Sequence, residues 1–367
     1  MLKSFSVKGF KNFENEFSID FSNVRDYKFH LECVTDGLLN TAIIYGKNAV
    51  GKSNFGLALF DIVSHLTMNN VTPGLYDYYL NVNNKNGEAS FEYQFMFGED
   101  EIIYGYNKSE KNDLRSEFLM LNGIVMFHRS SDMGLSENNG LVELAPNLNW
   151  EHANEISPLK YLFYNSPLAA DHPLSKMMKF VNNMLWFRFR SLDENRFIGY
   201  KEKSHDYLTF MIGEKDYINE FNDLLKQSGV DNSITVKKDT DGETRLYFDT
   251  KPPMPFMKVA SIGTKALYTF YYWYKTAPNV SFMYIDEFDA FYHYELAETI
   301  VKMLEKMSGF QKILTSHNTN LLSNRIMRPD CYFILARDNL IAFANATDRE
   351  LREGHNLEKL YISGEFN

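Results

Sequence analysis

The sequence predicts an α/β fold built on a mixed β-sheet, and three features of the chain support this prediction. A short apolar run at Thr41–Tyr45, typical of a buried strand, is followed by a glycine-containing loop and a helical pattern that continues to Leu66. Near the other end, helices and strands alternate over residues 266–315, which is typical of a parallel sheet. Between these segments, short strands separated by turn signals over residues 91–127 indicate an antiparallel region.

Composition limits the class of protein. The chain has 367 residues, 44% of them hydrophobic, so it can bury a sizeable core in one or two compact units. No apolar stretch approaches the roughly eighteen residues of a membrane-spanning helix, and the start lacks a secretion signal. We therefore expect a cytoplasmic protein with no membrane partner. Cys33 and Cys331 alone supply neither a disulfide framework nor a CxxC zinc motif.

The net charge of -10 gives no overall field that would attract a nucleic acid, so nucleic-acid binding would need a local basic patch. One weak candidate lies between Leu174 and Phe189 and just beyond, where basic and aromatic residues are interleaved. We interpret its charges as the solvated outer face of an apolar helix. The basic residues concerned are Lys176, Lys179, Arg188 and Arg190.

The remaining elements follow from periodicity and turn signals. Alternation over residues 2–7 and 17–21 predicts a pair of strands at a sheet edge. Helical spacing predicts helices at 53–66, 174–189, 217–227, 266–274 and 297–307, and apolar runs predict strands at 282–285 and 312–315. The Asp241-Gly242 turn joins a predicted hairpin, 234–238 with 244–248. These elements suggest an N-terminal lobe (1–130), a mostly helical insertion (131–250) and a C-terminal lobe (251–367).

The string GKNAVGKS matches the pattern G-x-x-x-x-G-K-[ST] of a phosphate-binding loop, or P-loop. Its glycines allow backbone N–H groups to point at phosphate oxygens. Lys52 would bridge the β- and γ-phosphates, and Ser53 would hold Mg²⁺. We therefore expect ATP and Mg²⁺ as ligands, with a nucleotide site formed by Gly46, Lys47, Asn48, Ala49, Val50, Gly51, Lys52, Ser53 and Asn54.

An apolar strand ends in two carboxylates at Asp286 and Glu287. Ligands bind at the carboxyl ends of buried parallel strands, so these groups are expected beside the P-loop. Asp286 would contact Mg²⁺ through a water, and Glu287 would polarise the attacking water. Alone, such a pair is more often a solvated turn; its combination with the P-loop favours catalysis.

Two further segments are weaker signals. The strand at 312–315 leads to His317, which could donate to the γ-phosphate, although a lone histidine is usually structural. The string SIGTK precedes a helix, whose N-terminus could bind a phosphate, although alone it is merely a helix cap. This second segment comprises Ser261, Gly263, Thr264 and Lys265 around Ile262, and we call residues 261–265 the signature segment.

The order of these four pieces resembles the Walker A, signature, Walker B and switch-histidine elements of ABC-type ATPases related to SMC proteins. The resemblance is closest to a short bacterial AAA-type ATP-binding family, similar to RecF and to the ATPase parts of OLD-like proteins, of the kind found in phage-defence and abortive-infection systems. Its motifs span both ends of the chain: VKGFKNF, GKNAVGKS, YGYN, SEFL, SIGTK, IDEFDAFYH, TSHNTNLL and LYISGEF.

The resemblance implies a P-loop fold of the ABC/SMC-head type and a head-to-head dimer or higher homo-oligomer, in which the signature segment of one subunit covers the γ-phosphate bound by another. It also implies a histidine seven residues after the first carboxylate, which is His293 here. The sequence departs from the family pattern at two places. Ala260 stands where the family has a leucine before Ser261, and no glutamine is clearly the Q-loop residue; the one considered is Gln94.

Three functions remain open at this stage. The first is an ATPase (ATP + H₂O to ADP + phosphate) that acts as a switch and controls a separate effector, plausibly a toxin, in antiphage defence. The second is a RecF-like ATPase that binds DNA in repair or maintenance, which the acidic balance disfavours. The third is a nucleotide-dependent scaffold without significant turnover, against which the intact Glu287 argues.

Overall fold

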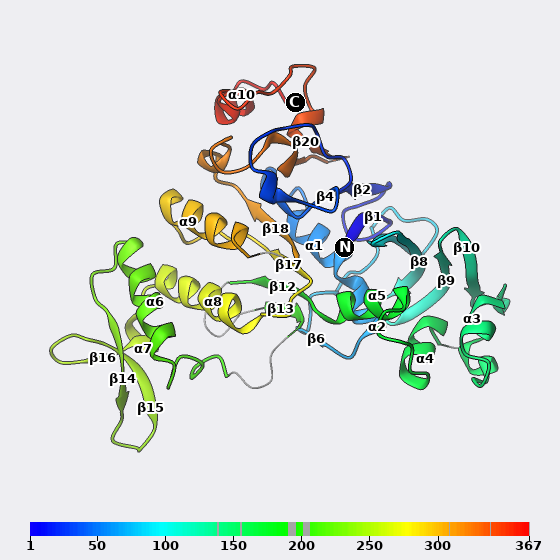
Figure 1. Cartoon of the computed structure of the whole chain (residues 1–367), viewed down its shortest axis with the longest axis horizontal. Helices are drawn as coiled ribbons and strands as arrows, with labels where there is room; N and C mark the ends of the chain where they lie inside the picture. Colours follow the sequence, from blue (N-terminus) through cyan, green and yellow to red (C-terminus); the bar gives the residue numbers. More distant parts are fainter. Residues whose placement is uncertain are drawn as a thin grey trace.

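The computed structural model describes residues 1–137, 139–154, 156–189, 196–200, 206–307, 309–337 and 339–366. Two large sheets meet near the middle of the molecule (Figure 1). Within these ranges the first sheet has seven strands, each antiparallel to its neighbours. Its order across the sheet is β11 (Gly134–Ser136), β10 (Ile124–Ser130), β9 (Asp113–Leu121), β8 (Asp100–Glu110), β7 (Ala89–Phe97), β1 (Leu2–Lys8) and β2 (Phe17–Asp20).

The second sheet is mixed and has eight strands in the described part of the chain. Its inner strands, from β19 to β12 in the order below, are parallel, and every residue of β5, β17 and β18 is buried, as expected for strands covered on both faces. The predicted parallel core is confirmed. The order is β20 (Leu340–Ala342), β19 (Tyr332–Leu335), β5 (Thr41–Tyr45), β18 (Gln311–Ser316), β17 (Phe282–Ile285), β12 (Met184–Arg188), β13 (Arg196–Gly199) and β6 (Asn70–Val71).

Helices and small sheets surround these two sheets. In Figure 1, α6, α7 and the sheet β14-β15-β16 project at one end beside α8, whereas α3 and α4 lie at the opposite end. The helices are α1 (Lys52–Leu59), α2 (Asp61–Leu66), α3 (Asn139–Leu144), α4 (Pro158–Asn165), α5 (Pro173–Asn182), α6 (Lys215–Gln227), α7 (Phe256–Val259), α8 (Ile262–Thr276), α9 (Tyr294–Glu305) and α10 (Leu357–Ile362). The small strands are β3 (Val34–Thr35), β4 (Leu38–Leu39), β14 (Ile234–Lys238), β15 (Thr244–Phe248) and β16 (Met254–Pro255).

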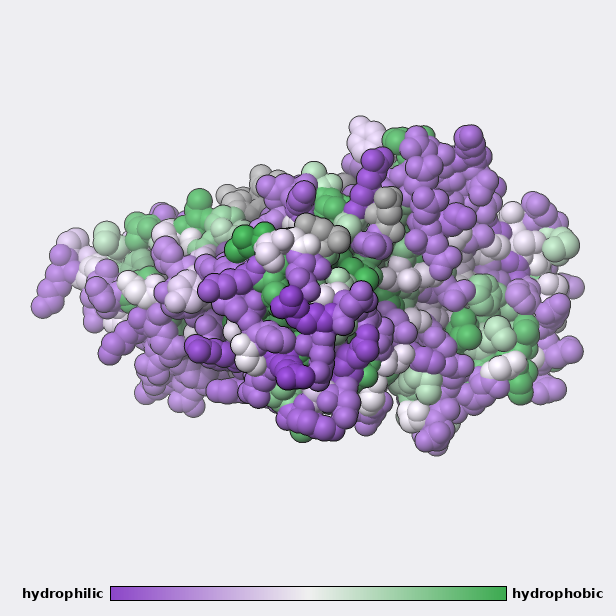
Figure 2. Space-filling view, turned by 90° about the horizontal axis from the view of Figure 1, so that it is seen from above, coloured by the Kyte–Doolittle hydropathy of each residue, from purple (hydrophilic) through white to green (hydrophobic). Residues whose placement is uncertain are grey.

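The surface seen in Figure 2 is largely hydrophilic, with hydrophobic residues in several separate groups. None of the helices in the described ranges is both long enough and apolar enough to cross a membrane.

Two sequence predictions about elements are wrong. The helix predicted over 53–66 is two helices, because α1 ends at Leu59 and α2 begins at Asp61, with Phe60 between them. The helix predicted over 174–189 is α5 followed by β12, since the apolar run of β12 pairs with β17 and is buried. A short apolar run of this kind cannot be assigned to helix or strand by periodicity alone. By contrast, the predicted pair of strands at a sheet edge is confirmed, because β1 pairs with β2 and β2 is an edge strand of the first sheet.

The strands β12 and β13 come from the segment that we assigned to an insertion. They extend the mixed sheet beyond β17, so this part of the segment belongs to the sheet itself. The remainder, with α6 and the β14-β15-β16 sheet, lies at the end of the molecule (Figure 1). The division of the chain into three parts at residues 130 and 250 stays a prediction.

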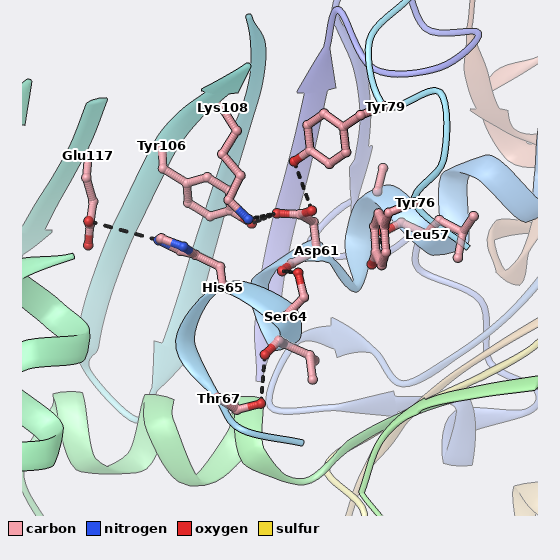
Figure 3. A network of polar contacts seen from close by, with 12 residues as sticks. Leu57, Asp61, Ser64, His65, Thr67, Tyr76, Tyr79, Tyr106, Lys108 and Glu117 are labelled. Atoms are coloured by element: carbon pink, nitrogen blue, oxygen red, sulfur yellow. Dashed lines mark hydrogen bonds and ion pairs between the residues drawn. The ribbon is translucent and has the colours of Figure 1, made fainter. Parts of the chain in front are cut away.

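A buried polar network joins α2 to the antiparallel sheet (Figure 3). Asp61, the first residue of α2, accepts hydrogen bonds from Lys108 Nζ at 2.5 Å and Tyr106 Oη at 3.0 Å, both on β8. Tyr79 Oη donates to the other oxygen of Asp61 at 2.9 Å. The side chains of Asp61 and Lys108 are 0% and 1% exposed, and burial lowers the pKa of Lys108. The helices α1 and α2 follow the P-loop in the chain. This network therefore fixes these two helices against the antiparallel sheet.

We predict that Lys108→Met destabilises the protein by about 3–5 kcal/mol, because it leaves the Asp61 carboxylate buried without its cation. Chemical unfolding of the two proteins measures the difference. Lys8→Met, at the exposed end of β1 in the same sheet, is the matched control and should change stability by less than about 0.5 kcal/mol. A loss below about 1 kcal/mol in Lys108→Met would show that the pair contributes little.

Glu117 on β9 is a second buried acid in this region. Its Oε1 accepts from Tyr104 Oη at 2.9 Å and from Ser157 Oγ at 2.8 Å. Its Oε2 lies 4.0 Å from His65 Nε2, and neither of these two atoms has a hydrogen-bond partner among the described residues. Burial raises the pKa of Glu117 to about 7 and lowers that of His65. Both groups are thus favoured in their neutral forms.

This pKa predicts a pH dependence of stability. Between about pH 4.5 and 7 the folded protein keeps the Glu117 proton that the unfolded chain has released, so the free energy of unfolding falls as pH rises. The full contribution is roughly 3 kcal/mol. In urea unfolding at several pH values, Glu117→Gln should lack this part of the slope, and the exposed Glu110→Gln should retain it. Parallel profiles for wild type and Glu117→Gln would contradict the prediction.

Candidate functional site

The P-loop connects β5 to α1, as predicted. Gly51 precedes α1 with a φ of 117°, a left-handed value that favours glycine, and a Cβ there would lie 2.3 Å from Asn12 Nδ2. That same nitrogen donates to Val50 O at 3.0 Å, while Asn12 Oδ1 accepts from Asn54 Nδ2 at 2.8 Å. Asn12 therefore fixes the loop from the turn between β1 and β2. The sequence analysis did not single it out, although it lies in the VKGFKNF motif.

Lys52 folds back over its own loop. Its Nζ donates to Gly46 O at 2.8 Å and lies 3.3 Å from His317 Nδ1. Burial lowers the pKa of Lys52, and the charges of Asp286 and Glu287 act against this shift. Burial also lowers the pKa of His317, and the Lys52 charge adds to the effect, so the imidazole is neutral at pH 7. Its Nδ1 can then accept from Lys52, which leaves the proton on Nε2.

The carboxylates at the end of β17 are oriented by Thr315 at the end of β18. Thr315 Oγ1 donates to Asp286 Oδ1 at 2.8 Å and accepts from the backbone N of Glu287 at 2.7 Å. Asp286 is buried, and this burial raises its pKa. The side chain of Glu287 is 31% exposed, and its backbone has a φ of 51°, a left-handed value that costs a non-glycine residue roughly 1 kcal/mol or more. One acid is thus held inside and the other faces outward.

Arg188, the last residue of β12, binds both acids and the P-loop serine. Its Nη1 lies 3.2 Å from Ser53 Oγ and 3.4 Å from Asp286 Oδ2, and its Nη2 pairs with Glu287 Oε2. The prediction that this residue is a solvated charge on a helix is wrong, because β12 places it beside β17. Of the other basic residues in that patch, Lys176 and Lys179 lie on α5, and Arg190 lies outside the described residues.

These contacts show that the site fits a magnesium ion. Ser53 Oγ and Asp286 Oδ2 approach the same nitrogen of Arg188, so two hard oxygen atoms converge on one point beside the P-loop. Mg²⁺ in nucleotide sites takes one or two protein oxygens together with substrate phosphates and water. These two oxygens would hold such an ion near the point where the guanidinium nitrogen lies.

A cavity of about 470 Å³ adjoins the outer side of the P-loop. Ala49 and Val50 form one wall, and the turn after β1 forms another. The lining is mixed, with amide and charged groups beside the buried rings of Phe13 and Phe17. The lining residues include Asn12, Glu14, Asn81, Asn83 and Arg337.

The signature segment lies at the start of α8. Ser261 caps this helix, since its Oγ accepts from Thr264 N at 3.1 Å. Gly263 packs closely on the loop after β17, where an added Cβ would lie 2.8 Å from Phe291 O. Lys265 is half-buried in the first turn. A cavity of about 580 Å³ lies here, between the first turns of α8 and α9, and His293 is part of its wall.

The structure therefore brings the P-loop, the two acids and His317 together, but it leaves the signature segment apart. No hydrogen bond between described residues joins Ser261 or Gly263 to the P-loop. Gln94 is likewise remote, because it lies on β7 and donates to Glu101 at 2.6 Å. The sequence analysis did not single out Asp289. Its carboxylate accepts a hydrogen bond from Ser316 Oγ at 2.5 Å, and burial raises its pKa to about 6.

Comparison with known proteins gives one family. A family model described as "AAA domain, putative AbiEii toxin, Type IV TA system" matches residues 42–323, a range that contains the P-loop, the signature segment, the acid pair and His317. No curated protein matches the chain.

Several solved structures are similar to the chain. One is described as "Crystal structure of the SmcHead bound to the C-winged helix domain of ScpA" (16% identity, TM-score 0.45, 93% of this chain and 97% of that chain). Another is the SMC head domain from Thermotoga maritima (16%, 0.43, 93% and 98%). A third is the Smc head domain with an extended coiled coil bound to the C-terminal domain of ScpA, derived from Pyrococcus furiosus (14%, 0.46, 93% and 96%).

We predict that Gly51→Ala destabilises the protein by about 1–3 kcal/mol, because alanine at this φ is strained and its methyl group displaces the Asn12 side chain. Thermal and urea unfolding measure the loss. Gly354→Ala is the control, since no atom lies within 4 Å of its added Cβ and its φ is ordinary. Equal stability of the two variants would mean that the loop relaxes without cost.

Proposed function

This chain belongs to the AAA domain family whose model it matches, and on that basis we propose that it is a cytoplasmic ATP-binding and ATP-hydrolysing switch. In this proposal, ATP closes a sandwich dimer or larger homo-oligomer, which controls a separate effector protein in antiphage defence. One observation supports the ATPase most directly: the ends of β5, β17 and β18 bring Lys52, Glu287 and His317 to one place.

Nucleotide binding would begin at the P-loop. Backbone N–H groups of Gly46–Ser53 would surround the β-phosphate, and Lys52 Nζ would exchange Gly46 O for β- and γ-phosphate oxygens. Ser53 and Asp286 would hold Mg²⁺, which when bound neutralises phosphate charge and orients the γ-phosphate. The 470 Å³ cavity beside Val50 is the proposed place of the nucleoside.

Hydrolysis would use the outward acid. Glu287 would orient a water whose oxygen attacks the γ-phosphorus, while the bond from that phosphorus to the β–γ bridging oxygen breaks, giving ADP and phosphate. Its partly exposed carboxylate and its fixed backbone support this role. Neutral His317 would donate its Nε2 proton to a γ-phosphate oxygen, with Lys52 keeping the ring oriented. Thr315 would position Asp286 and Glu287 without touching the substrate.

The signature segment would act on the nucleotide of a second copy. Two features support this: Ser261 is exposed at the start of a 15-residue helix, and no contact within the described chain ties it to the P-loop. Ser261, Gly263, Thr264 and Lys265 would thus cover the partner's γ-phosphate. Exposed apolar side chains nearby, Ile262 at 57% and Tyr294 at 45%, would be covered by the same closure.

The effector and the defence role rest on the family description, which names a toxin–antitoxin system. The DNA-binding alternative gains no specific support, because the net charge is -10 and Arg188, from the candidate basic patch, is engaged with the two acids. A salt-sensitive, ATP-dependent gel shift would favour that alternative.

The test is the solution mass of Glu287→Gln with and without Mg-ATP, by light scattering after size exclusion. We predict ATP binding without turnover, a loss of roughly a hundredfold or more in hydrolysis, and a mass increase with ATP. Lys52→Ala should bind ATP about tenfold or more weakly and stay at its starting mass. Ser261→Arg should bind ATP without assembling.

Two outcomes would contradict parts of this proposal. Absence of ATP binding by the wild type would reject the nucleotide site. Undiminished hydrolysis in Ser261→Arg would reject the arrangement in which one subunit completes the site of another.

A further inference from the structure

Arg188 contacts the three groups that the proposed ATPase needs for metal binding and water activation. We propose that its guanidinium competes with Mg²⁺ for Ser53 and Asp286, so that loading the metal also releases Glu287. This inference rests on the proposed function, and it adds a residue and a step that the P-loop and acid motifs do not contain.

The distances require the competition. Arg188 Nη1 is 3.2 Å from Ser53 Oγ and 3.4 Å from Asp286 Oδ2, the two oxygens proposed to hold the metal. A magnesium ion held by these two oxygens would lie next to the guanidinium charge. Like charges this close repel strongly in a partly buried site. The guanidinium must therefore withdraw when the metal takes its oxygens.

Withdrawal has a consequence for the second acid. The other terminal nitrogen of the same guanidinium, Nη2, pairs with Glu287 Oε2. The planar guanidinium holds both contacts at once, so it cannot leave Ser53 and Asp286 without weakening its contact with Glu287. Glu287 is thereby kept from a water until the metal is in place. Turnover in the absence of a correctly loaded metal is suppressed by this arrangement.

The side chain is also suited to move. Arg188 Nε is buried and has no hydrogen-bond partner among the described residues, so it gains one if the guanidinium shifts toward a phosphate oxygen. The residue stands at the end of β12, with only part of its side chain exposed, and its backbone is held by pairing with Arg196 of β13. A phosphate is a preferred partner for a guanidinium, so the bound nucleotide supplies a place for it.

The experiment is a magnesium titration of nucleotide binding. A fluorescent ATP analogue at fixed concentration is mixed with the full-length protein, and the Mg²⁺ concentration for half-maximal binding is read from fluorescence anisotropy. Because charge-assisted hydrogen bonds to Ser53 and Asp286 are lost, Arg188→Ala should lower this concentration about tenfold or more. Arg188→Lys, which keeps a charge but cannot contact all three groups, should fall between Arg188→Ala and wild type.

Arg196→Ala is the matched control. Arg196 faces Arg188 in the β12–β13 register, and no hydrogen bond or ion pair in the described part of the chain joins it to Ser53, Asp286 or Glu287, so its removal should leave the Mg²⁺ requirement unchanged. A second readout needs no nucleotide: Mg²⁺ alone should raise the thermal unfolding midpoint of Arg188→Ala more than that of the wild type. Both readouts apply to Arg188→Lys if the alanine variant does not fold.

An unchanged or increased Mg²⁺ requirement in both Arg188 variants would overturn the inference while the wild type still binds the analogue, and the ATPase proposal would stand. Failure of the wild type to bind the analogue at any Mg²⁺ concentration would instead reject the nucleotide site, and the inference with it.

Discussion

The buried carboxylate of Asp286 is the constraint on which the centre of this molecule depends. An unpaired charge in a protein interior is costly, so its partners must be held in place by the fold. Three elements supply them: Thr315 from β18 at 2.8 Å, Arg188 from β12, and Ser53 through the guanidinium they share. The strand order β12-β17-β18 places two of these side chains on either side of β17. A shift in register of either neighbouring strand would remove one of these partners from the acid.

A second buried carboxylate, which also needs a partner, lies against the antiparallel sheet. Asp61 begins α2 and takes its cation, Lys108, from β8. Since α1 carries Lys52 and Ser53 and α2 continues from it, the position of the P-loop helix is set at one end by the loop and at the other by this ion pair. The two sheets are thus joined through charged groups as well as through the apolar core. The break between α1 and α2, which the sequence did not predict, lets Asp61 face Lys108.

The parts of the site that could be predicted are those encoded by contiguous residues. The P-loop and the acidic end of β17 each need only a local string, and their placement on strand ends follows from periodicity. Asn12, Arg188 and Thr315 could not be assigned in the same way, because each acts on residues far away in the chain. For Arg188 the difficulty was also local, since an apolar run of this length fits a buried strand or a helix equally well. Its role became visible only when pairing with β17 was known.

The chain geometry links the nucleotide site to the signature segment by a short path. From Ser261, α8 runs through 15 residues, about 22 Å, before the chain returns along β17 to the acids. The loop that follows them then reaches back to the start of α8, where Gly263 lies against Phe291 so closely that a methyl group would not fit. The backbone after Glu287 is therefore in direct contact with the helix cap that carries Ser261. Only three residues separate Glu287, which pairs with Arg188, from Phe291 at this contact, so the acid pair and the exposed start of α8 are adjacent in the fold.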